Sequence, residues 1–282
     1  MPTVYQYKTE NLAIGDVYGG HDSNRYYLHE YFEKVPALNS AIEKIANGTG
    51  AAPVITIDFT NGYNKANRSF EIITSGTITC EFNTTSGISL TTEAANNSSL
   101  IVLPHLDAGQ TAWKEINWNT ASQVHWSCAV SINNISNVIF WSGLKLTNTE
   151  TLVTDNDQAY FTFDPTGKSG NAFTNAGNLH FVYSIGGTDY ITDLGLTVAA
   201  DTIYKLRIEI DSNRQIQVYV NDVLYGLATT SDATGTTTAN TLVKSLALTN
   251  NINLIPYVGV KTGEAAAKTL NLCYEHISKA IS

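Results

Sequence analysis

The feature that most constrains the fold of this chain is a two-residue alternation of apolar and polar side chains in short segments. The clearest case is "YKLRIEIDSNRQIQVYVNDVLYG", residues 204–226. Turn-forming residues separate its strands at 211–214 and again at 221–222. The alternation predicts three antiparallel strands in a meander, with Arg207, Glu209 and Gln217 facing away from the core. The side chains expected to be buried are Leu206, Ile208, Ile210, Ile216, Val218 and Val220.

The same alternation recurs from Pro53 to the end of the chain. Segments such as "SFEIIT", "TITCEF", "GISLTT" and "SLIVLP" are separated by residues rich in Gly, Asn, Asp, Ser and Thr. Many short strands with turn signals between them are typical of all-β folds. We therefore predict a mainly β chain, folded as an antiparallel two-sheet jelly-roll sandwich over residues 51–282. With 43% hydrophobic residues, this length is enough to bury one large core.

The N-terminal part of the chain carries a different pattern. In residues 23–46, "SNRYYLHEYFEKVPALNSAIEKIA", apolar residues from position 27 to position 35 recur at the spacing of one helical face. Pro36 is expected to end this helix or to open a second one. We predict a helical docking segment over residues 1–50, with the alternative that it packs on its own sandwich. The candidate docking side chains are Tyr26, Tyr27, Leu28, Tyr31, Phe32 and Val35.

Charge and cysteine content exclude several classes of function. The net charge is -9 and the sequence has no Lys/Arg block, so binding to nucleic acid is not expected. No apolar run approaches the length of about 20 residues that a membrane span needs, and the first residues do not resemble a signal peptide. Cys80, Cys128 and Cys273 are scattered, so we interpret them as buried thiols and expect neither disulfides nor zinc.

The order of several segments resembles a known family. These segments are "FWSGLKLTNT", "TDNDQAYFTFD", "LHFVYSIGGTDYITDLGLTV", the strand–turn–strand above and "NLIPYVGVKTGEAAAKTLNLCYEHISKAI". Their succession is similar to the concanavalin A-like (LamG-type) jelly-roll module of tailed-bacteriophage virion structural proteins, and the upstream "LPHLDAGQTAWKEINWNT" fits as well. The resemblance covers residues 100–281 as an order of motifs and is vaguer over residues 53–99.

This resemblance implies a function without catalysis. It suggests a virion structural protein, a capsid decoration protein or a head or tail fibre protein, assembled in the host cytoplasm and exposed on the particle surface. Its expected partners are other virion proteins and further copies of itself. A glycan-binding adhesin that holds a host-surface glycan is the main alternative, and a glycoside hydrolase is a third. The resemblance does not imply any catalytic residues, because proteins of this fold have many different functions.

The enzyme alternative can be tested against the residues. Laminarinase-type glycosidases of this fold carry Glu-x-Asp-x-(x)-Glu on one strand, which places the two reacting carboxylates on one face. Here Glu209 and Asp211 supply the first two positions, but residues 212–214 are Ser, Asn and Arg, so the third carboxylate is missing. We therefore expect no catalytic residues, no cofactor and no enzymatic activity.

The remaining candidates are carboxylates and indole rings. Asp155 and Asp157 precede an alternating strand and are interpreted as turn residues rather than metal ligands, because Gln158 and Ala159 break the spacing of a calcium loop. Because a distant loop can supply further oxygen ligands, calcium binding at Asp155 and Asp157 stays an open alternative. Trp126 and Trp141 are expected in the core, whereas Trp113 and Trp118 are glycan-binding candidates. The histidines at 105, 125, 180 and 276 are assigned no role.

Overall fold

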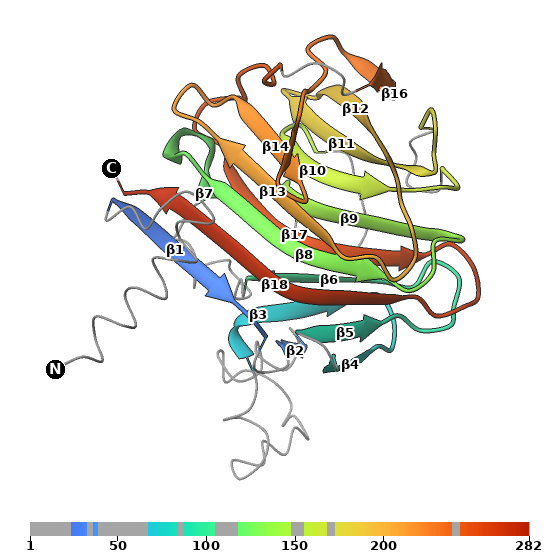
Figure 1. Cartoon of the computed structure of the whole chain (residues 1–282). Helices are drawn as coiled ribbons and strands as arrows, with labels where there is room; N and C mark the ends of the chain where they lie inside the picture. Colours follow the sequence, from blue (N-terminus) through green and yellow to red (C-terminus); the bar gives the residue numbers. More distant parts are fainter. Residues whose placement is uncertain are drawn as a thin grey trace, which may run out of the picture.

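The structure is a two-layered β-sandwich, which confirms the predicted fold class (Figure 1). It is a computed structural model, and neighbouring strands pair antiparallel except at two sheet edges, where β12 pairs with β16 and β2 pairs with β3 in parallel. The structure describes residues 24–32, 36–38, 67–83, 87–104, 118–147, 155–167, 173–238 and 243–281.

One layer is an eight-stranded sheet in the order β15-β14-β13-β8-β18-β5-β4, with β1 also paired to β18. Its strands are β1 (Arg25–Glu30), β4 (Thr79–Phe82), β5 (Ile88–Thr91), β8 (His125–Ile132), β13 (Tyr204–Ile210), β14 (Ile216–Val220), β15 (Val223–Tyr225) and β18 (Thr269–Ala280).

The other layer is a ten-stranded sheet in the order β16-β12-β11-β10-β9-β17-β6-β3-β2, with β7 also paired to β17. Its strands are β2 (Pro36–Leu38), β3 (Asn67–Thr74), β6 (Ser99–Pro104), β7 (Trp118–Asn119), β9 (Val138–Lys145), β10 (Gln158–Phe163), β11 (Asn178–Ile185), β12 (Thr188–Thr197), β16 (Asp232–Thr238) and β17 (Asn253–Thr262). A single 3-10 turn, η1 (Thr120–Ser122), follows β7 among the described residues.

The meander predicted from residues 204–226 is confirmed in detail. β13 pairs antiparallel with β14, and β14 pairs with β15. The exposed fraction is at most 1% for each predicted core side chain, while Arg207, Glu209 and Gln217 point the other way and are half-buried. The alternation therefore sets both the strands and the face that each side chain takes.

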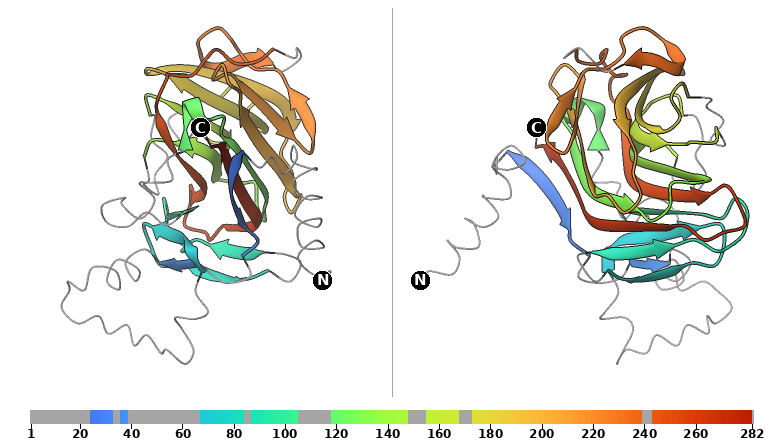
Figure 2. Two further views of the ribbon diagram at one scale, coloured as in Figure 1. Left: turned by 90° about the vertical axis from the view of Figure 1, so that its left-hand side faces the viewer. Right: turned by 45° about the vertical axis from the view of Figure 1, so that its right-hand side comes forward.

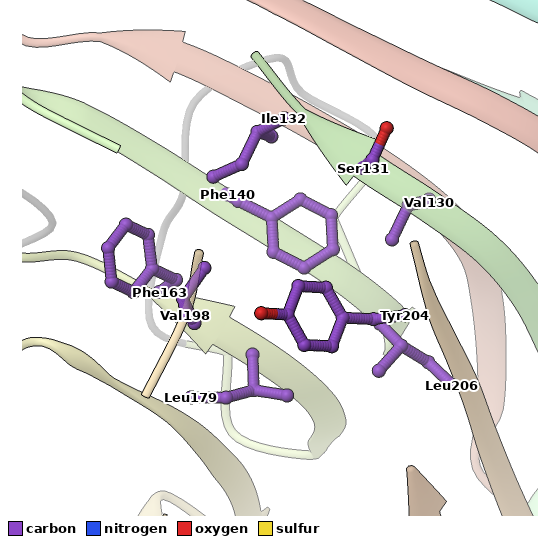
Figure 3. Close-up of a pocket in the computed structure, with 9 residues that line it drawn as sticks. All are labelled: Val130, Ser131, Ile132, Phe140, Phe163, Leu179, Val198, Tyr204 and Leu206. Atoms are coloured by element: carbon purple, nitrogen blue, oxygen red, sulfur yellow. The ribbon is translucent and has the colours of Figure 1, made fainter. Parts of the chain in front are cut away.

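The main core lies between the two sheets. At one end of this core, nine residues from both layers line a cavity of about 10 Å³ (Figure 3). They are Val130, Ser131, Ile132, Phe140, Phe163, Leu179, Val198, Tyr204 and Leu206. A space of this size holds about one water molecule. We interpret it as a small packing gap in the apolar core rather than a ligand site.

The ten-stranded sheet is buried on both faces. Leu100 and Val102 of β6 face the main core, while Ile101 and Leu103 belong to a second apolar cluster on the opposite face. Trp141 of β9 belongs to that second cluster, and it leaves no room for a side chain at Gly259 on the neighbouring strand: a Cβ there would lie 2.5 Å from Trp141 Cε2.

The N-terminal helix predicted over residues 23–35 is wrong where the structure describes it, because residues 25–30 form strand β1. β1 pairs with the C-terminal strand β18 from Arg25–Ala280 to Glu30–Glu275, and Figures 1 and 2 show the two strands side by side. Tyrosine favours strands, and pairing with β18 outweighs the local helical spacing. Pro36 begins the short strand β2, which spans residues 36–38. The expected boundary at residue 50 lies outside the described residues.

β18 pairs with two strands along one edge and carries a bulge between the two pairings. β5 pairs with its first part, up to Leu272, and β1 pairs with its last part, while the register on β8 shifts between Leu272 and Tyr274. Gly87 lies against this bulge with φ +72°, and a Cβ there would be 2.0 Å from the Leu272 carbonyl oxygen. Only glycine satisfies both the close approach and the left-handed backbone.

The inner face of β18 carries a fully buried carboxyl group, Glu275. Its Oε1 accepts a 2.9 Å hydrogen bond from Trp126 Nε1, and Glu30 of β1 lies opposite it in the register. The pKa of Glu275 is raised to about 8, mainly by burial and also by the nearby Glu30 carboxylate, while the hydrogen bond from Trp126 acts in the opposite direction. At neutral pH, Glu275 is therefore mainly a neutral acid in the folded protein.

The first prediction concerns Phe32, which lies just after β1. Its ring is 1% exposed and packs edge-to-face on Phe70 with centroids 5.6 Å apart. Phe32→Ala should lower the free energy of unfolding by about 3 kcal/mol, measured by denaturant titration. The matched control is Tyr31→Ala, which removes a 44% exposed ring and should cost less than about 0.5 kcal/mol. Equal effects of the two variants would contradict the placement of residues 25–32 in the sandwich.

The second prediction concerns the pH dependence of stability. Between the usual glutamate pKa of 4.5 and about 8, the unfolded chain has released the Glu275 proton and the folded chain still holds it. Stability therefore falls as the pH rises through this range, by about 1.4 kcal/mol per pH unit at most. Glu275→Gln removes the contribution of this carboxyl group to the pH dependence of stability. Its stability relative to the parent should increase from pH 5 to pH 8, and parallel pH profiles would show that Glu275 is not buried as a neutral acid.

Candidate functional site

The candidate site is a cluster of aromatic rings on the outer face of the eight-stranded sheet, where β1 and β18 pair. Tyr27, His29 and Tyr31 alternate along β1 and its end, and Tyr274 and His276 alternate along β18. Neighbouring ring centroids are 4.5 Å apart for His29 and His276, 4.6 Å for Tyr274 and His276, and 5.0 Å for Tyr31 and His276. We call these five residues the aromatic cluster.

Part of the aromatic cluster is open to solvent. Tyr31 is 44% exposed and His29 is also exposed, while Tyr27 and Tyr274 are half-buried and His276 forms the floor. The pKa of His276 is lowered to about 3, mainly by burial and also by His29, so the His276 ring is neutral at physiological pH. The cluster therefore presents flat apolar ring surfaces with tyrosine hydroxyl groups beside them.

The predicted docking residues separate between the two faces of β1. Tyr26 and Leu28 pack on the main core, and Phe32 is inside it. Tyr27 and Tyr31 belong to the outer face and to the aromatic cluster. Val35 lies outside the described residues. A strand with a period of two produces this split, whereas the predicted helix would have placed Tyr27, Leu28, Tyr31 and Phe32 on one side.

The tryptophan candidates do not supply an exposed surface in the described part of the chain. Trp118 is 4% exposed and its ring centroid lies 5.9 Å from that of Tyr26. Trp126 and Trp141 are buried in the two apolar clusters, as predicted. Trp113 lies outside the described residues. Among the described residues, the large rings on the outer face of the ten-stranded sheet are also buried, so they offer no surface comparable to the aromatic cluster.

The carboxylates considered for catalysis are engaged in holding the sheet and its turns. Glu209 Oε1 lies 3.0 Å from Arg207 Nη1. Asp211 accepts backbone hydrogen bonds from Asn213 and Gln215 in the β13–β14 turn and pairs with Lys244 at 2.7 Å. The carboxyl group with the most raised pKa, Glu275, is fully buried in the core, where no substrate reaches it.

Asp155 and Asp157 have the surroundings of turn residues. Asp155 Oδ2 accepts hydrogen bonds from the backbone nitrogens of Leu146 and Thr147, and it lies 3.5 Å from the Nζ atom of the buried Lys145. Asp157 accepts a hydrogen bond from the hydroxyl of Thr249. The described residues contain no group of three or more His, Cys, Asp or Glu side chains able to hold a metal ion.

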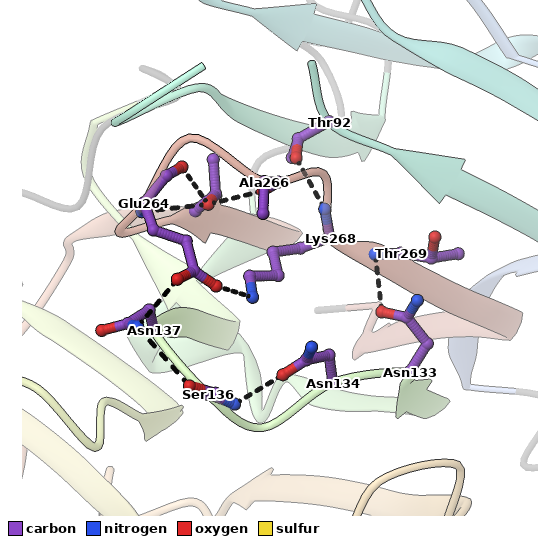
Figure 4. Close-up of polar contacts among 10 residues, drawn as sticks. Thr92, Asn133, Asn134, Ser136, Asn137, Glu264, Ala266, Lys268 and Thr269 are labelled. Atoms are coloured by element: carbon purple, nitrogen blue, oxygen red, sulfur yellow. Dashed lines mark hydrogen bonds and ion pairs between the residues drawn. The ribbon is translucent and has the colours of Figure 1, made fainter. Parts of the chain in front are cut away.

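A further polar group joins the β8–β9 turn to the β17–β18 connection (Figure 4). Lys268 Nζ lies 2.5 Å from Glu264 Oε1, and Asn137 Nδ2 donates to Glu264 Oε2 at 2.9 Å. Asn133 Oδ1 accepts the backbone N–H of Thr269 at 2.9 Å. These groups bond to one another across two loops, so we assign them a structural role.

The cysteines are all unpaired. Cys128 is buried, as predicted, and its Sγ lies 3.3 Å from the hydroxyl oxygen of Ser142, while Cys80 and Cys273 are only half-buried. In the part of the chain that the structure describes, no helix is long and apolar enough to span a membrane.

Comparison with known proteins relates this chain to others by fold alone. No protein-family model matches the sequence, and no curated protein matches it. A protein of unknown function from Shewanella oneidensis MR-1 has a similar structure, with 9% sequence identity and a TM-score of 0.50, over 97% of this chain and 94% of that one. At this identity the likeness supports the fold and carries no function.

Other similar structures include a carbohydrate recognition domain and a binding domain. The carbohydrate recognition domain of Emp47p has 6% identity and a TM-score of 0.47, over 76% of this chain and 90% of that one. The binding domain of Paraclostridial Mosquitocidal Protein 1 has 15% identity and a TM-score of 0.41, over 78% of this chain and 45% of that one. A link to phage proteins does not appear among these structures.

The third prediction tests the turn interpretation of Asp155. Burial lowers the pKa of Lys145 to about 8, against the opposing effect of Asp155. Asp155→Ala should destabilise the protein by about 3 kcal/mol, because Lys145 would be left buried without its carboxylate. Calcium added to a metal-free sample should leave the melting temperature of the parent unchanged. A calcium-dependent rise in the parent that is absent in Asp155→Ala would establish a calcium site instead.

Proposed function

We propose that this chain is a non-enzymatic carbohydrate-binding protein that holds its ligand on the aromatic cluster. The observation that carries the proposal is the set of adjoining rings on β1 and β18, with His29 and Tyr31 exposed. Sugar rings have apolar C–H faces that pack on aromatic rings, while their hydroxyl groups need hydrogen-bonding partners. Tyrosine meets both needs because it combines a flat ring with a hydroxyl group.

The sheet holds these rings in a fixed arrangement before any ligand arrives. Register pairs His29 with His276, and the His276 ring packs against both Tyr31 and Tyr274. A surface that is already ordered loses less conformational entropy on binding than one formed by flexible side chains. Aromatic rings held on paired strands are therefore well suited to bind an oligosaccharide.

The absence of catalysis is part of the proposal. Of the carboxylates weighed as acid or base, Glu209 pairs with Arg207, Asp211 caps a turn, and Glu275 is inside the core. A glycosidase needs two carboxyl groups that both reach the sugar. Incubation with bacterial cell-surface polysaccharides is expected to release no reducing ends, and release abolished by Glu209→Gln would revive the enzyme alternative.

We further propose that the protein works as an adhesin on a tailed-phage virion, as a capsid decoration or head or tail fibre protein. The support is the order of motifs over residues 100–281. In this setting its partners are other virion proteins, further copies of itself and a host-surface glycan, and it is assembled in the host cytoplasm. Mass spectrometry of purified particles should detect the chain at a fixed stoichiometry. Its absence from particles would remove the virion proposal and leave carbohydrate binding intact.

The fourth prediction tests the aromatic cluster as the ligand surface. Replacing Tyr27 and Tyr31 together with alanine should weaken oligosaccharide binding by about tenfold or more, because two stacking rings are lost. Binding is measured by calorimetric titration with ligands selected on a glycan array. The control is Phe82→Ala, which removes a 59% exposed ring from β4 of the same sheet. Equal weakening by both variants, or no glycan bound by the parent, would contradict the proposal.

A further inference from the structure

The paired strands β1 and β18 carry two carboxyl groups on their inner face. The register places Glu30 of β1 directly opposite Glu275 of β18, and side chains in such positions have Cβ atoms about 5 Å apart. Glu275 is fully buried, and its Oε2 atom makes no hydrogen bond within the described part of the chain. Like charges directly opposite each other destabilise a strand pair, so ionisation of both groups would push β1 away from β18.

The groups around Glu275 favour its neutral form. On its other flank, Cys128 of β8 lies opposite it, and burial raises the pKa of that thiol well above its usual value, so the thiol is neutral. Trp126 donates one hydrogen bond to Oε1. Lys279 shares the inner face of β18 but lies four residues further along the strand, about 13 Å away. An ionised Glu275 would therefore keep one hydrogen bond and face the Glu30 carboxylate.

Of the two strands beside Glu275, β1 is the one that can move. β8 lies inside the sheet between β13 and β18, and seven of its eight residues are buried. Among the described residues, β1 has β18 as its only partner strand, and none of its six residues is fully buried. A strand with few buried contacts opens at a lower free-energy cost than a central one. Release of β1 is therefore the least costly way to hydrate an ionised Glu275.

We propose that the Glu30–Glu275 pair is a proton-operated latch, in which neutral Glu275 holds β1 on β18 and loss of its proton releases β1. Release removes the three rings that the β1 segment supplies to the aromatic cluster and leaves only Tyr274 and His276 in place. The latch therefore controls whether the aromatic cluster is assembled. It goes beyond the proposed carbohydrate binding and does not depend on it, because it needs no ligand.

The direction of the pH dependence follows from the proton that Glu275 holds. Its pKa is about 8 while β1 is paired, and hydration returns it toward the usual 4.5 when β1 is released. Low pH therefore favours the paired form, and the released fraction rises by up to about tenfold per pH unit between these two values. On the opposite face His276 has the reverse effect, because its pKa is lowered to about 3 in the paired form, but this effect ends near the usual histidine value of 6.5. Between pH 6.5 and 8, the effect of Glu275 is unopposed by His276.

Cleavage by trypsin after Arg25, the first residue of β1, measures the released form. Between pH 6.5 and 8, the cleavage rate of the full-length protein, divided by that of Glu275→Gln at the same pH, should rise by about tenfold or more. Glutamine keeps an oxygen that accepts the hydrogen bond from Trp126 but has no proton to lose. Fragments are identified by mass spectrometry. The control is Glu81→Gln, which removes an exposed carboxyl group from β4 of the same sheet and should be cleaved like the parent.

Glu30→Gln tests the other half of the latch. Glutamine keeps an oxygen for the backbone N–H of Phe32, which donates to Glu30 Oε1 at 2.6 Å, and it removes the charge that helps to raise the pKa of Glu275. The rise in cleavage should then end at a lower pH than in the parent. A parent-to-Glu275→Gln ratio that stays constant with pH would overturn the latch. Cuts after Arg207 of β13 that increase in step with those after Arg25 would show unfolding of the whole sandwich and would contradict a local release of β1.

Discussion

The pairing of β1 with β18 is the interaction on which the rest of this structure depends. It joins a strand near the N-terminus to the last strand of the chain, over a register from Arg25–Ala280 to Glu30–Glu275. On its inner face the pair supplies Tyr26 and Leu28 to the main core. On its outer face the same pair assembles the aromatic cluster from side chains about 245 residues apart in sequence. Core completion and the candidate site are therefore two consequences of one strand pairing.

Local alternation predicts the fold well where strands are bounded by clear turns. Residues 204–226 show this, since Ile208 and Val218 are buried on the face that the sequence predicts. The N-terminal prediction failed because residues 27, 28, 31 and 32 fit a helical spacing, while a strand over the same residues places Tyr27 and Tyr31 on one face and Leu28 and Phe32 on the other. Local spacing alone does not distinguish a helix from a strand over these residues. Pairing with β18, which is distant in sequence, determines the strand.

The aromatic cluster could not be predicted as a site for the same reason. Helical spacing favours Tyr27 and Tyr31 only as part of one apolar face, and no local pattern distinguishes His29, Tyr274 or His276 as site residues. A strand reading of residues 25–31 would have separated Tyr27, His29 and Tyr31 from Tyr26 and Leu28. Their association with Tyr274 and His276 also requires the register on β18. By contrast, the engagement of Asp155 and Asp211 in turns follows from their positions next to turn residues.

The most direct test of this account is amide hydrogen exchange of residues 25–30 in the folded protein. Because β1 is paired with β18 along its length, its hydrogen-bonded amides should exchange as slowly as those of residues 275–280, and both groups should be released together on unfolding. Rapid exchange of residues 25–30 while residues 270–280 stay protected would contradict the strand pairing. It would also separate the two halves of the aromatic cluster and remove the proposed binding surface.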